Sequence, residues 1–570
     1  MNIKIRDTHA VDTDNINSID GNGILDAILN NRNITTEEER EYFLHGDISL
    51  QHSASLLKDA DKAADVIAQH IKAGDLIVVY SDYDADGWGA AIVGVKLMRR
   101  LGANVVYHTN TRAFGYGANA QGVEAMLAKY PDVKLVVTTD NGIVAYDAVN
   151  IMNSHGIDVV VTDHHEPSQD GILPDALAVV NPKRLDDEYP FKGLCGAAVI
   201  WKVMGLVFQQ MGHTIDETYD MLDVVAFSTI GDVVPLVDEN RLIVKEGLKL
   251  INASDCKEEW NILRAANSTF NNKVGAVDAK TVAFTFVPQV NACSRLIGNI
   301  DDACSIFLDD NVTAKKKAAE YIREVNEERK ERTTDQTERA YTLCNGLDGC
   351  PVIVIENDNF DDGIVGLIAG RIKEAFWAPA IVLTNDPEKE GILRGSGRSI
   401  EGFPMKKILD EIQDEYGILE GYGGHDMACG LSVKKENLEH LRSALCMKAI
   451  GCLEVEDYYK TVVVDVDIHD DESIAYVCDA LGEIGPYGAE FPAPVVRIKN
   501  FTPKDIRITG AEGQHVIFKG ENISVKCWKG ADEYKEKGSP TTITAYGELR
   551  FSSFDGKYEL VVSPELVLPA

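Results

Sequence analysis

The chain has 570 residues, too many for one hydrophobic core, so we expect three or four domains. A hydrophobic content of 45% and a charged content of 26% are ordinary for a globular protein, and no apolar run reaches the ~20 residues of a membrane span. The net charge of −35 opposes non-specific phosphate binding, so it mildly favours a small substrate, and a polynucleotide would need a local basic channel. Eleven scattered cysteines and an N-terminus without an apolar leader predict reduced thiols and a cytoplasmic protein that does not bind membranes.

The N-terminal half of the chain begins with helical and then alternating patterns. Residues 1–72 are predicted to form a helical segment packed on the next domain, with a capping-box-like helix start near Thr35. From residue 73 to about 238, apolar runs alternate with helical patterns, including crossover helices over 87–101 and 146–155. This alternation predicts a doubly wound parallel sheet.

Three apolar runs in this region end in acidic or acid–histidine clusters. The clusters are Asp82, Asp84 and Asp86; Asp140; and Asp163, His164 and His165. A single Asp after a strand is usually a cap or a turn residue, but three clusters at consecutive strand ends are not explained by capping. Because the carboxyl ends of parallel strands share one crevice, these ligand types predict a divalent-metal site and a metal-dependent phosphoester hydrolase. A fourth apolar run ends at Asp232.

The remaining patterns divide the chain further. The segment 241–300 is mainly helical, so the first large domain is placed over 73–310. Residues 311–345 form a charged connecting helix whose charges are expected to face solvent. A second, smaller α/β unit is predicted over 346–454. Short β segments separated by Gly, Asp and Pro predict a small β-barrel over 455–570.

The acidic motifs, taken in order, resemble a known superfamily. Asp82-Tyr-Asp-Ala-Asp-Gly87, Asp163-His-His165 and Gly231-Asp232 are together similar to the DHH phosphoesterases, and within them to the RecJ family of single-strand-specific 5′→3′ exonucleases. Further segments similar to that family are Asn31–Leu44, Val290–Leu296, Gly363–Arg371, Gly395–Ser399, Gly423–Gly430, Gly485–Pro494 and Gly513–His515. The resemblance implies an α/β multidomain protein: a DHH domain with a parallel sheet, a linking helix, a smaller α/β DHH-associated domain and a C-terminal OB-like β-barrel. The chain departs from the family at Phe360-Asp361-Asp362, where Trp-His is common, and at Ser294, which replaces a glycine.

The resemblance also implies a metal-ligand set. The implied ligands of two Mn²⁺ or Mg²⁺ ions are Asp84, Asp86, Asp140, His164 and Asp232, with Asp140 as the bridge. Hard carboxylates suit both ions, and an imidazole favours Mn²⁺. Asp82 shares a face with Asp84 and Asp86 if the segment is extended, but it is ranked below them as a direct ligand.

Catalytic roles are assigned to His165, Asp163 and Asp140. Asp163 is expected to orient an imidazole and fix its tautomer. His165 is a candidate for donating a hydrogen bond to the scissile phosphate, and the alternative that it only packs against or orients His164 carries equal weight.

The implied nucleic-acid contacts lie on both sides of the connecting helix. They are Arg112, Arg295, Arg371, Ser396, Arg398 and His425. The Gly395–Ser399 segment combines a pliable backbone with hydroxyl and guanidinium donors, although a Gly-Ser-Gly stretch alone is usually a turn. Aromatic residues of the predicted barrel, among them Trp528 and Phe551, are available for stacking on bases, with core packing as the alternative.

The resemblance implies a monomeric 5′→3′ exonuclease that degrades single-stranded DNA to mononucleotides in recombination, repair or replication. A single-strand-binding protein or a helicase is an implied partner. Two alternatives stay open. A nano-RNA or cyclic-dinucleotide phosphodiesterase would suit the acidity but leaves residues 455–570 unexplained, and a catalytically inactive DHH scaffold does not fit the retained ligands.

Overall fold

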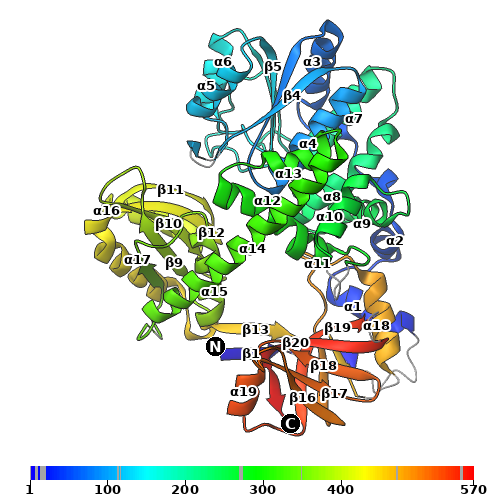
Figure 1. The fold of residues 1–570 in the computed structure, drawn as a ribbon, viewed down its shortest axis with the longest axis vertical. Coiled ribbons are helices and arrows are strands. Elements are labelled where there is room, and N and C mark those ends of the chain that lie inside the picture. The colour runs from blue at the N-terminus through cyan, green and yellow to red at the C-terminus, as the bar shows by residue number, and fades with distance from the viewer. Residues whose placement is uncertain are drawn as a thin grey trace. The chain divides into compact units, whose positions relative to one another are not determined.

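The computed structural model describes residues 2–6, 11–12, 21–111, 114–115, 117–268, 274–347, 349–469, 473–552 and 556–570. The chain forms two compact units (Figure 1). The parallel-sheet unit comprises Glu37–Arg329 and Pro486–Pro492, and the mixed-sheet unit comprises Met1–Thr36, Lys330–Gly485 and Ala493–Ala570. The division falls within helix α14 (Val312–Leu343), in the region where the sequence predicts a connecting helix.

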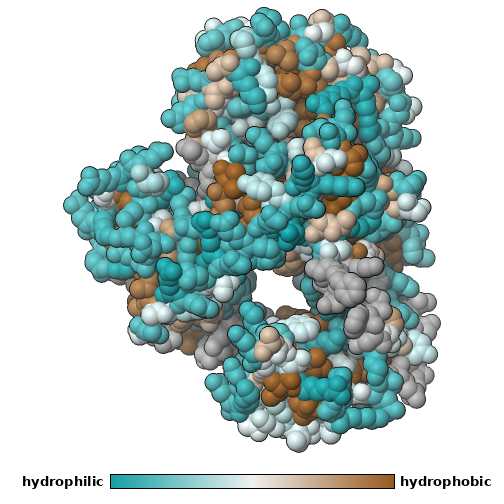
Figure 2. All heavy atoms as spheres, in the orientation of Figure 1, coloured by the Kyte–Doolittle hydropathy of each residue, from teal (hydrophilic) through white to brown (hydrophobic). Residues whose placement is uncertain are grey.

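Hydrophilic side chains predominate on the face drawn in Figure 2, and hydrophobic ones form separated patches. None of the described helices is both long enough and apolar enough to cross a membrane.

The parallel-sheet unit is built on five strands in the order β4-β3-β5-β6-β7, all parallel. Their bounds are β3 (Leu76–Ser81), β4 (Asn104–Thr109), β5 (Val133–Thr139), β6 (Asp158–Thr162) and β7 (Ala178–Val180). Side chains on β3 alternate between two cores, with Ile77 and Val79 in one and Val78 and Tyr80 in the other. Because both faces are covered, the strands are almost continuously apolar.

Helices cover both faces of this sheet, as Figure 1 shows. One face carries α5 (Ala120–Lys129) and α6 (Tyr146–Ser154), and the other carries α3 (Ala60–Ala73), α4 (Ala85–Arg100) and α7 (Gly196–Gln210). The predicted doubly wound sheet is therefore confirmed. The strand order reverses between β3 and β5, which is where such folds open a crevice for ligands.

The fourth apolar run forms a helix, α8 (Leu222–Gly231), and not another strand. Its residues from Leu222 to Thr229 are all buried, and a helix that is apolar all round belongs inside a core. Other helices of the parallel-sheet unit are α2 (Glu37–His45), α9 (Asp238–Asn252), α10 (Glu258–Ala266), α12 (Val287–Ala292) and α13 (Asp301–Leu308).

The mixed-sheet unit contains the predicted smaller α/β domain. Its five strands have the order β11-β12-β10-β9-β8, with β8 and β9 parallel and the other pairs antiparallel. The bounds are β8 (Ile353–Glu356), α15 (Val365–Phe376), β9 (Ala380–Asn385), β10 (Ile392–Arg398), α16 (Met405–Tyr416), β11 (Leu419–His425), β12 (Ala428–Lys434) and α17 (Leu438–Cys452).

The C-terminal part of this unit is the predicted OB-like β domain, a sheet in the order β16-β17-β18-β20-β19-β15-β14-β2. The bounds are β2 (Val11–Asp12), β14 (Val466–Ile468), α18 (Ser473–Ile484), β15 (Val496–Phe501), β16 (Asp505–Thr509), β17 (His515–Lys519), β18 (Ile523–Cys527), α19 (Ala531–Glu536), β19 (Ile543–Ser552) and β20 (Lys557–Pro569). All of these strands except β2 lie within 455–570, where the sequence predicts short β segments.

The N-terminal segment differs from the predicted helical arrangement. Strand β1 (Asn2–Arg6) pairs in parallel with β13 (Tyr459–Val463), and β2 pairs with β14. Residues 1–36, including helix α1 (Gly21–Asn31), group with the mixed-sheet unit, whereas the sequence placed 1–72 against the parallel-sheet domain. The N-terminal strands satisfy backbone groups that strands more than 400 residues away would otherwise leave unpaired.

Candidate metal centre

The acid clusters meet at one edge of the parallel sheet. Asp82 follows β3, Asp140 follows β5 and Asp163 follows β6, and these three strands are neighbours. All three carboxyl groups are almost completely buried. The crevice at the strand-order reversal is therefore lined by acids from consecutive strand ends.

Asp84 and Asp86 are held by hydrogen bonds to helix starts. Asp84 is the N-cap of α4, and its carboxylate accepts from the amides of Asp86 (2.9 Å) and Gly87 (3.1 Å). Asp86 accepts from the amides of Gly196 (2.6 Å) and Ala197 (3.0 Å) at the start of α7. Capping thus explains how both side chains are oriented, but it leaves lone pairs of each carboxylate available for a ligand.

Asp140 occupies a strained position. Its φ of 60° lies in the left-handed region, which aspartate adopts more readily than most residues but which still costs energy. A Cβ on Gly196 would lie 2.5 Å from the Cβ of Asp140, so this close approach requires glycine. Both carboxylate oxygens of Asp140 are buried without a hydrogen-bond donor among the described residues.

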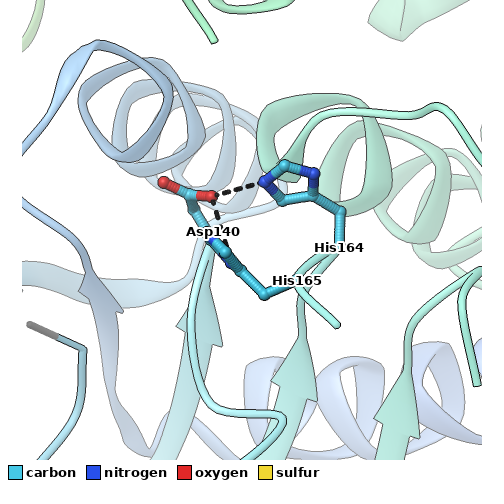
Figure 3. A group of neighbouring side chains, drawn as sticks. All are labelled: Asp140, His164 and His165. Atoms are coloured by element: carbon cyan, nitrogen blue, oxygen red, sulfur yellow. Dashed lines mark ion pairs between the residues drawn. The ribbon is translucent and has the colours of Figure 1, made fainter. Parts of the chain in front are cut away.

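The two histidines differ in their partners. His164 points its Nε2 at three carboxylates, with oxygens of Asp140, Asp232 and Asp86 at 3.2, 3.5 and 3.6 Å (Figure 3 shows the first). The Nδ1 of His165 lies 2.7 Å from Asp163 and 4.0 Å from Asp140. The rings of His164 and His165 contact each other, with centroids 4.5 Å apart.

Asp163 holds the turn that carries both histidines. Its Oδ1 accepts from the amides of His164 (2.7 Å) and His165 (3.1 Å) and from the His165 ring, and its Oδ2 accepts from the amide of Ile143 (2.8 Å). Each carboxylate oxygen thus accepts at least one hydrogen bond, and the bond from Nδ1 orients the His165 ring.

Asp232 reaches the crevice from the end of a helix. It is the C-cap of α8, and the next residue, Val233, has a φ of 60°, a rare conformation for a β-branched side chain. The Asp232 carboxylate lies 3.5 Å from the Nε2 of His164, and the chain changes direction directly after it.

Three groups of side chains place ligating atoms within 4.8 Å of one another in this crevice. They are Asp140, His164 and His165; Asp86, His164 and Asp232; and Asp82, Asp84 and Asp140. Asp140 belongs to the first and the last group, so its carboxylate lies close both to the two histidines and to Asp82 and Asp84.

The electrostatics of the crevice are those of a cluster of buried acids. Burial, followed by repulsion from neighbouring carboxylates, raises the pKa of Asp82, Asp140 and Asp232 well above the usual range. Burial lowers the pKa of His164 to about 4, which leaves its ring neutral and able to bind a metal.

In the Asp163–His165 ion pair next to the cluster, the pKa values shift in the opposite directions to those of the clustered acids and His164. Burial alone would raise the pKa of Asp163, but the hydrogen bond and charge of His165 lower it to about 2. Burial alone would lower the pKa of His165, but its bond to Asp163 raises it to about 9. His165 is therefore an imidazolium at neutral pH, beside the carboxylates of the cluster.

This donor set fits divalent cations. The carboxylates and the neutral imidazole of His164 are the ligand types that Mg²⁺ and Mn²⁺ accept. The buried oxygens of Asp140 and the buried nitrogens of His164, which lack hydrogen-bond partners among the described residues, are the atoms that a metal would satisfy. A cation would also offset the repulsion that raises the pKa of these acids.

The predicted nucleic-acid contacts divide between the two units. Arg112 lies outside the described residues. Arg295 lies in a π-helical turn, Cys293–Ile297, of the parallel-sheet unit. Arg371, on α15, donates to the carbonyl and hydroxyl oxygens of Thr333 and Thr337 on α14 (3.3 Å each), so it takes part in helix packing.

Ser396 and Arg398 lie on a strand and not in a turn. They occupy β10, the central strand of the five-stranded sheet, and the Arg398 guanidinium donates to the Ser396 hydroxyl (2.6 Å). Alternate residues of a strand share a face, which explains why the pair meets. His425 is exposed at the end of β11, on the edge of the same sheet.

Gly196 and Ala197, whose amides hold Asp86, were not among the predicted site residues. A glycine opening an apolar helical run was the available signal, because it marks a helix N-terminus that can bind an anion. Their role depends on α4 and α7 lying together, which the local pattern does not show.

Family models match three regions of the chain. They describe the N-terminal domain of the DHH family over residues 76–229, the DHHA1 domain over 349–449 and the RecJ OB domain over 464–563. These regions coincide with the parallel sheet, the smaller α/β domain and the C-terminal β domain.

Curated relatives match most of the chain. The single-stranded-DNA-specific exonuclease RecJ of Bacillus subtilis is 34% identical over 507 residues, which are 88% of this chain and 62% of that protein. The RecJ exonuclease of Escherichia coli is 30% identical over 489 residues, or 83% of this chain and 82% of that protein. The chain thus spans less than two thirds of the length of the Bacillus protein.

Solved structures share the fold. RecJ from Thermus thermophilus in complex with Mn²⁺ superposes with a TM-score of 0.79 at 24% identity, covering 98% of this chain and 79% of that one. An exonuclease RecJ bound to manganese gives a TM-score of 0.57 at 27% identity, covering 69% of this chain and 95% of that one.

Proposed function

The chain belongs to the RecJ family of single-stranded-DNA-specific exonucleases, and from this premise we propose that it hydrolyses single-stranded DNA from the 5′ end to mononucleotides. The observation that carries the proposal is the convergence of Asp86, Asp140, His164 and Asp232 on one crevice, where the buried oxygens of Asp140 and both ring nitrogens of His164 have no hydrogen-bond partner among the described residues. We place the activity in DNA recombination, repair or replication.

Two divalent cations, Mn²⁺ or Mg²⁺, are the proposed cofactors. Asp86, His164 and Asp232 would hold one, Asp82 and Asp84 would hold the other, and Asp140 is in reach of both groups. When bound, such a pair supplies an activated water and neutralises charge on the phosphate. Asp82 is included because its carboxylate atoms lie with those of Asp84 and Asp140.

His165 is the proposed donor to the scissile phosphate. Asp163 fixes its ring through Nδ1, which leaves Nε2 to donate, and its raised pKa keeps it protonated at neutral pH. A protonated imidazole stabilises negative charge that builds up on the phosphate oxygens during hydrolysis. This supports a role in chemistry over packing alone, although its ring also contacts His164.

Arg112, Arg295, Arg371, Ser396, Arg398 and His425 remain the proposed nucleic-acid contacts. Within this set, the common face of Ser396 and Arg398 on β10 supports the proposal that both contact nucleic acid. The bonds of Arg371 to α14 argue against such a contact for Arg371. Burial lowers the pKa of Arg398, and a phosphate would restore a counter-ion to that guanidinium.

The C-terminal β domain is the proposed grip on longer strands. Trp528 and Phe551 are each about half exposed. The ring centroid of Trp528 lies 5.0 Å from that of His515, and the ring centroid of Phe551 lies 5.4 Å from that of Tyr558. Alanine at either position is expected to weaken binding to a long strand by about 1–3 kcal/mol and to leave hydrolysis of a short oligonucleotide unchanged. Fluorescence anisotropy with long and short strands measures the difference. Equal losses on both would contradict the grip.

Substitution is a cleaner test of this grip than deletion. Removing 455–570 would take away the partners of β1 and β2, and it would also remove Pro486–Pro492, which belongs to the parallel-sheet unit.

The test of the proposed activity is a digestion with Mn²⁺. One single-stranded oligonucleotide is labelled at the 5′ end or, separately, at the 3′ end, with a blunt duplex as control. We expect immediate release of 5′ label as mononucleotide, gradual shortening of the 3′-labelled strand and an intact duplex. Turnover of di- to pentanucleotides without cleavage of the long strand would instead assign the chain to small-substrate phosphodiesterases. The match of the RecJ OB domain over 464–563 disfavours that alternative.

The proposed partner is single-stranded DNA, with a single-strand-binding protein or a helicase as the source of strands. A monomeric state and a cytoplasmic location remain part of the proposal.

A further inference from the structure

A short segment of the C-terminal half of the chain belongs to the parallel-sheet unit. The chain leaves the mixed-sheet unit after Gly485, contributes Pro486–Pro492 to the parallel-sheet unit and returns at Ala493. In sequence this segment lies between α18 and β15, far from every acid of the metal centre. Its position in the other unit calls for a physical reason.

The segment is a closed turn anchored by an aromatic side chain. Gly488 and Phe491 exchange backbone hydrogen bonds of 3.0 and 3.2 Å, and Glu490 between them has a φ of 57°. The Phe491 ring is 3% exposed and lies 4.7 Å from that of Phe43. Phe491 also stacks on Tyr487, with centroids 6.1 Å apart.

A buried arginine completes the anchor. The Arg241 guanidinium lies 3.6 Å from the centroid of Phe43 and 5.4 Å from that of Phe491. It donates to the carbonyl of Pro486 (3.0 Å) and to that of Phe43 (3.0 Å). Such stacking and hydrogen bonding fix both the rings and the backbone of the segment.

The anchored turn packs against the loop that follows the proposed metal ligand Asp232. The amide of Leu236 donates to the carbonyl of Ala489 (2.8 Å). A Cβ on Gly488 would lie 2.9 Å from Leu236 Cδ2 and 3.2 Å from its Cβ, so an added methyl group would crowd the Leu236 side chain. Leu236 is four residues after Asp232, and the chain between them turns through Val233 at a φ of 60°.

The same loop is joined to the segment that holds Asp86. The Asn240 amide group donates to the carbonyls of Pro235 (2.9 Å) and Gly193 (2.6 Å). Three residues beyond Gly193, the amides of α7 begin to hold the Asp86 carboxylate. Asp232 and Asp86 therefore both depend on loops that meet at Asn240, and the inserted turn packs on one of them.

We propose that Pro486–Pro492 is a clamp that positions Asp232 with Asp86 and His164, so that cation binding by this group depends on the inserted segment. The inference rests on the proposed metal-dependent function. The clamp residues are positioning residues and contact no ligand. Outer contacts of this kind orient metal ligands, and their loss weakens metal binding without removing a ligand.

The clamp is tested in the whole 570-residue chain with Gly488→Ala, which crowds the contact between the turn and Leu236. The matched control is Gly482→Ala, because a Cβ there meets nothing within 4 Å. Mn²⁺ binding is measured by calorimetry on both variants, on wild type and on Asp232→Asn. We expect Gly488→Ala to bind one Mn²⁺ as wild type does and the other about tenfold more weakly, and we expect excess Mn²⁺ to restore hydrolysis.

The outcomes separate the clamp from the function. Wild type that binds no Mn²⁺ would overturn the proposed function and the clamp with it. Wild type that binds two ions, with Asp232→Asn losing one and Gly488→Ala losing nothing, would overturn the clamp alone. A lower melting temperature of Gly488→Ala with unchanged Mn²⁺ affinities would show a purely structural role and would also overturn it. Phe491→Leu keeps an apolar side chain but loses the stacking on Phe43 and Tyr487. It is expected to weaken binding of the same Mn²⁺ ion that Gly488→Ala weakens.

Discussion

At the carboxyl ends of β3 and β5, Asp82 and Asp140 are buried among other acids, whereas Asp467 on β14 is buried beside cations. The Asp467 carboxylate pairs with the guanidinium of Arg497 (2.5 Å) and the ammonium of Lys499 (3.1 Å). Burial would raise the pKa of Asp467, but the bonds to Arg497 outweigh it and lower the pKa. For Asp82 and Asp140, burial and repulsion act in the same direction and raise the pKa.

The parallel-sheet unit pairs its other buried acids in the same way as Asp467. Glu259 shares one oxygen between Lys96 (3.3 Å) and Lys315 (3.0 Å), and Glu239 pairs with Lys202 at 2.8 Å. A buried charge without a partner is strongly destabilising. The strand-end acids are therefore not a general feature of an acidic protein. His165, the imidazolium beside them, is already paired with Asp163, so further positive charge has to come from outside the chain, and that requirement indicates function.

The largest expected effect removes one of the unpaired acids. Asp140→Asn should abolish hydrolysis, because it removes the carboxylate in reach of both ligand groups. Asparagine tolerates a φ of 60° and relieves repulsion, so the metal-free protein should be equally stable or more stable by about 1 kcal/mol. Hydrolysis of a 5′-labelled strand and thermal unfolding in chelator measure the two effects. Substantial turnover at saturating Mn²⁺ would refute the assignment.

The converse substitution removes a paired acid. Asp467→Asn should destabilise the C-terminal β domain by about 3 kcal/mol, because it leaves the buried Arg497 guanidinium without its carboxylate. Hydrogen exchange of β14 and β15 reports the loss locally. Asp505→Asn is the control in the same sheet, since its pair with Arg507 is exposed. Equal losses of protection in both variants would show that the buried Asp467 pair stabilises the sheet no more than the exposed Asp505 pair does.

A third prediction uses pH. The raised pKa of Asp140 and Asp232 means that these acids keep protons at higher pH than usual, so Mn²⁺ has to displace them. Affinity should therefore rise with pH while the acids are still protonated, by about tenfold per pH unit for each proton released. Calorimetry in two buffers of different ionisation enthalpy counts those protons. Binding at mildly acidic pH without proton release would contradict the raised pKa.

The smallest effect concerns an exposed pair. Lys504 and Glu521 lie 2.7 Å apart, but both side chains are about two-thirds exposed. Lys504→Ala should change the free energy of unfolding by less than about 0.5 kcal/mol, because water screens the attraction. Thermal unfolding beside Asp467→Asn makes the comparison. A loss similar to that of Asp467→Asn would show that burial is not what makes pairing important.

The fold class could be predicted because its signals are local. Continuous β-branched runs such as Leu76–Ser81 mark strands covered on both faces, and the alternation with helices dictates a parallel sheet. The acids directly after β3, β5 and β6 share an edge whatever the details of packing. Their convergence follows from strand direction alone.

Other features could not be read locally. The run before Asp232 is as apolar as the strands, and only its burial among helices makes it α8. Gly395–Ser399 was interpreted as a pliable phosphate-binding segment, yet neighbours on both sides make Ile392–Arg398 the central strand β10. Periodicity over a few residues does not distinguish these outcomes.

The parallel sheet and the acids at its edge could therefore be predicted from the sequence, because each depends on residues that are close along the chain. Three features depend on tertiary packing: β1 and β2 pair with β13 and β14, the Gly196 and Ala197 amides hold Asp86, and Pro486–Pro492 packs on Leu236. These contacts are made by backbone groups of residues distant in sequence. Backbone groups are the same in nearly every residue, so the side-chain pattern carries no signal of which of them will meet.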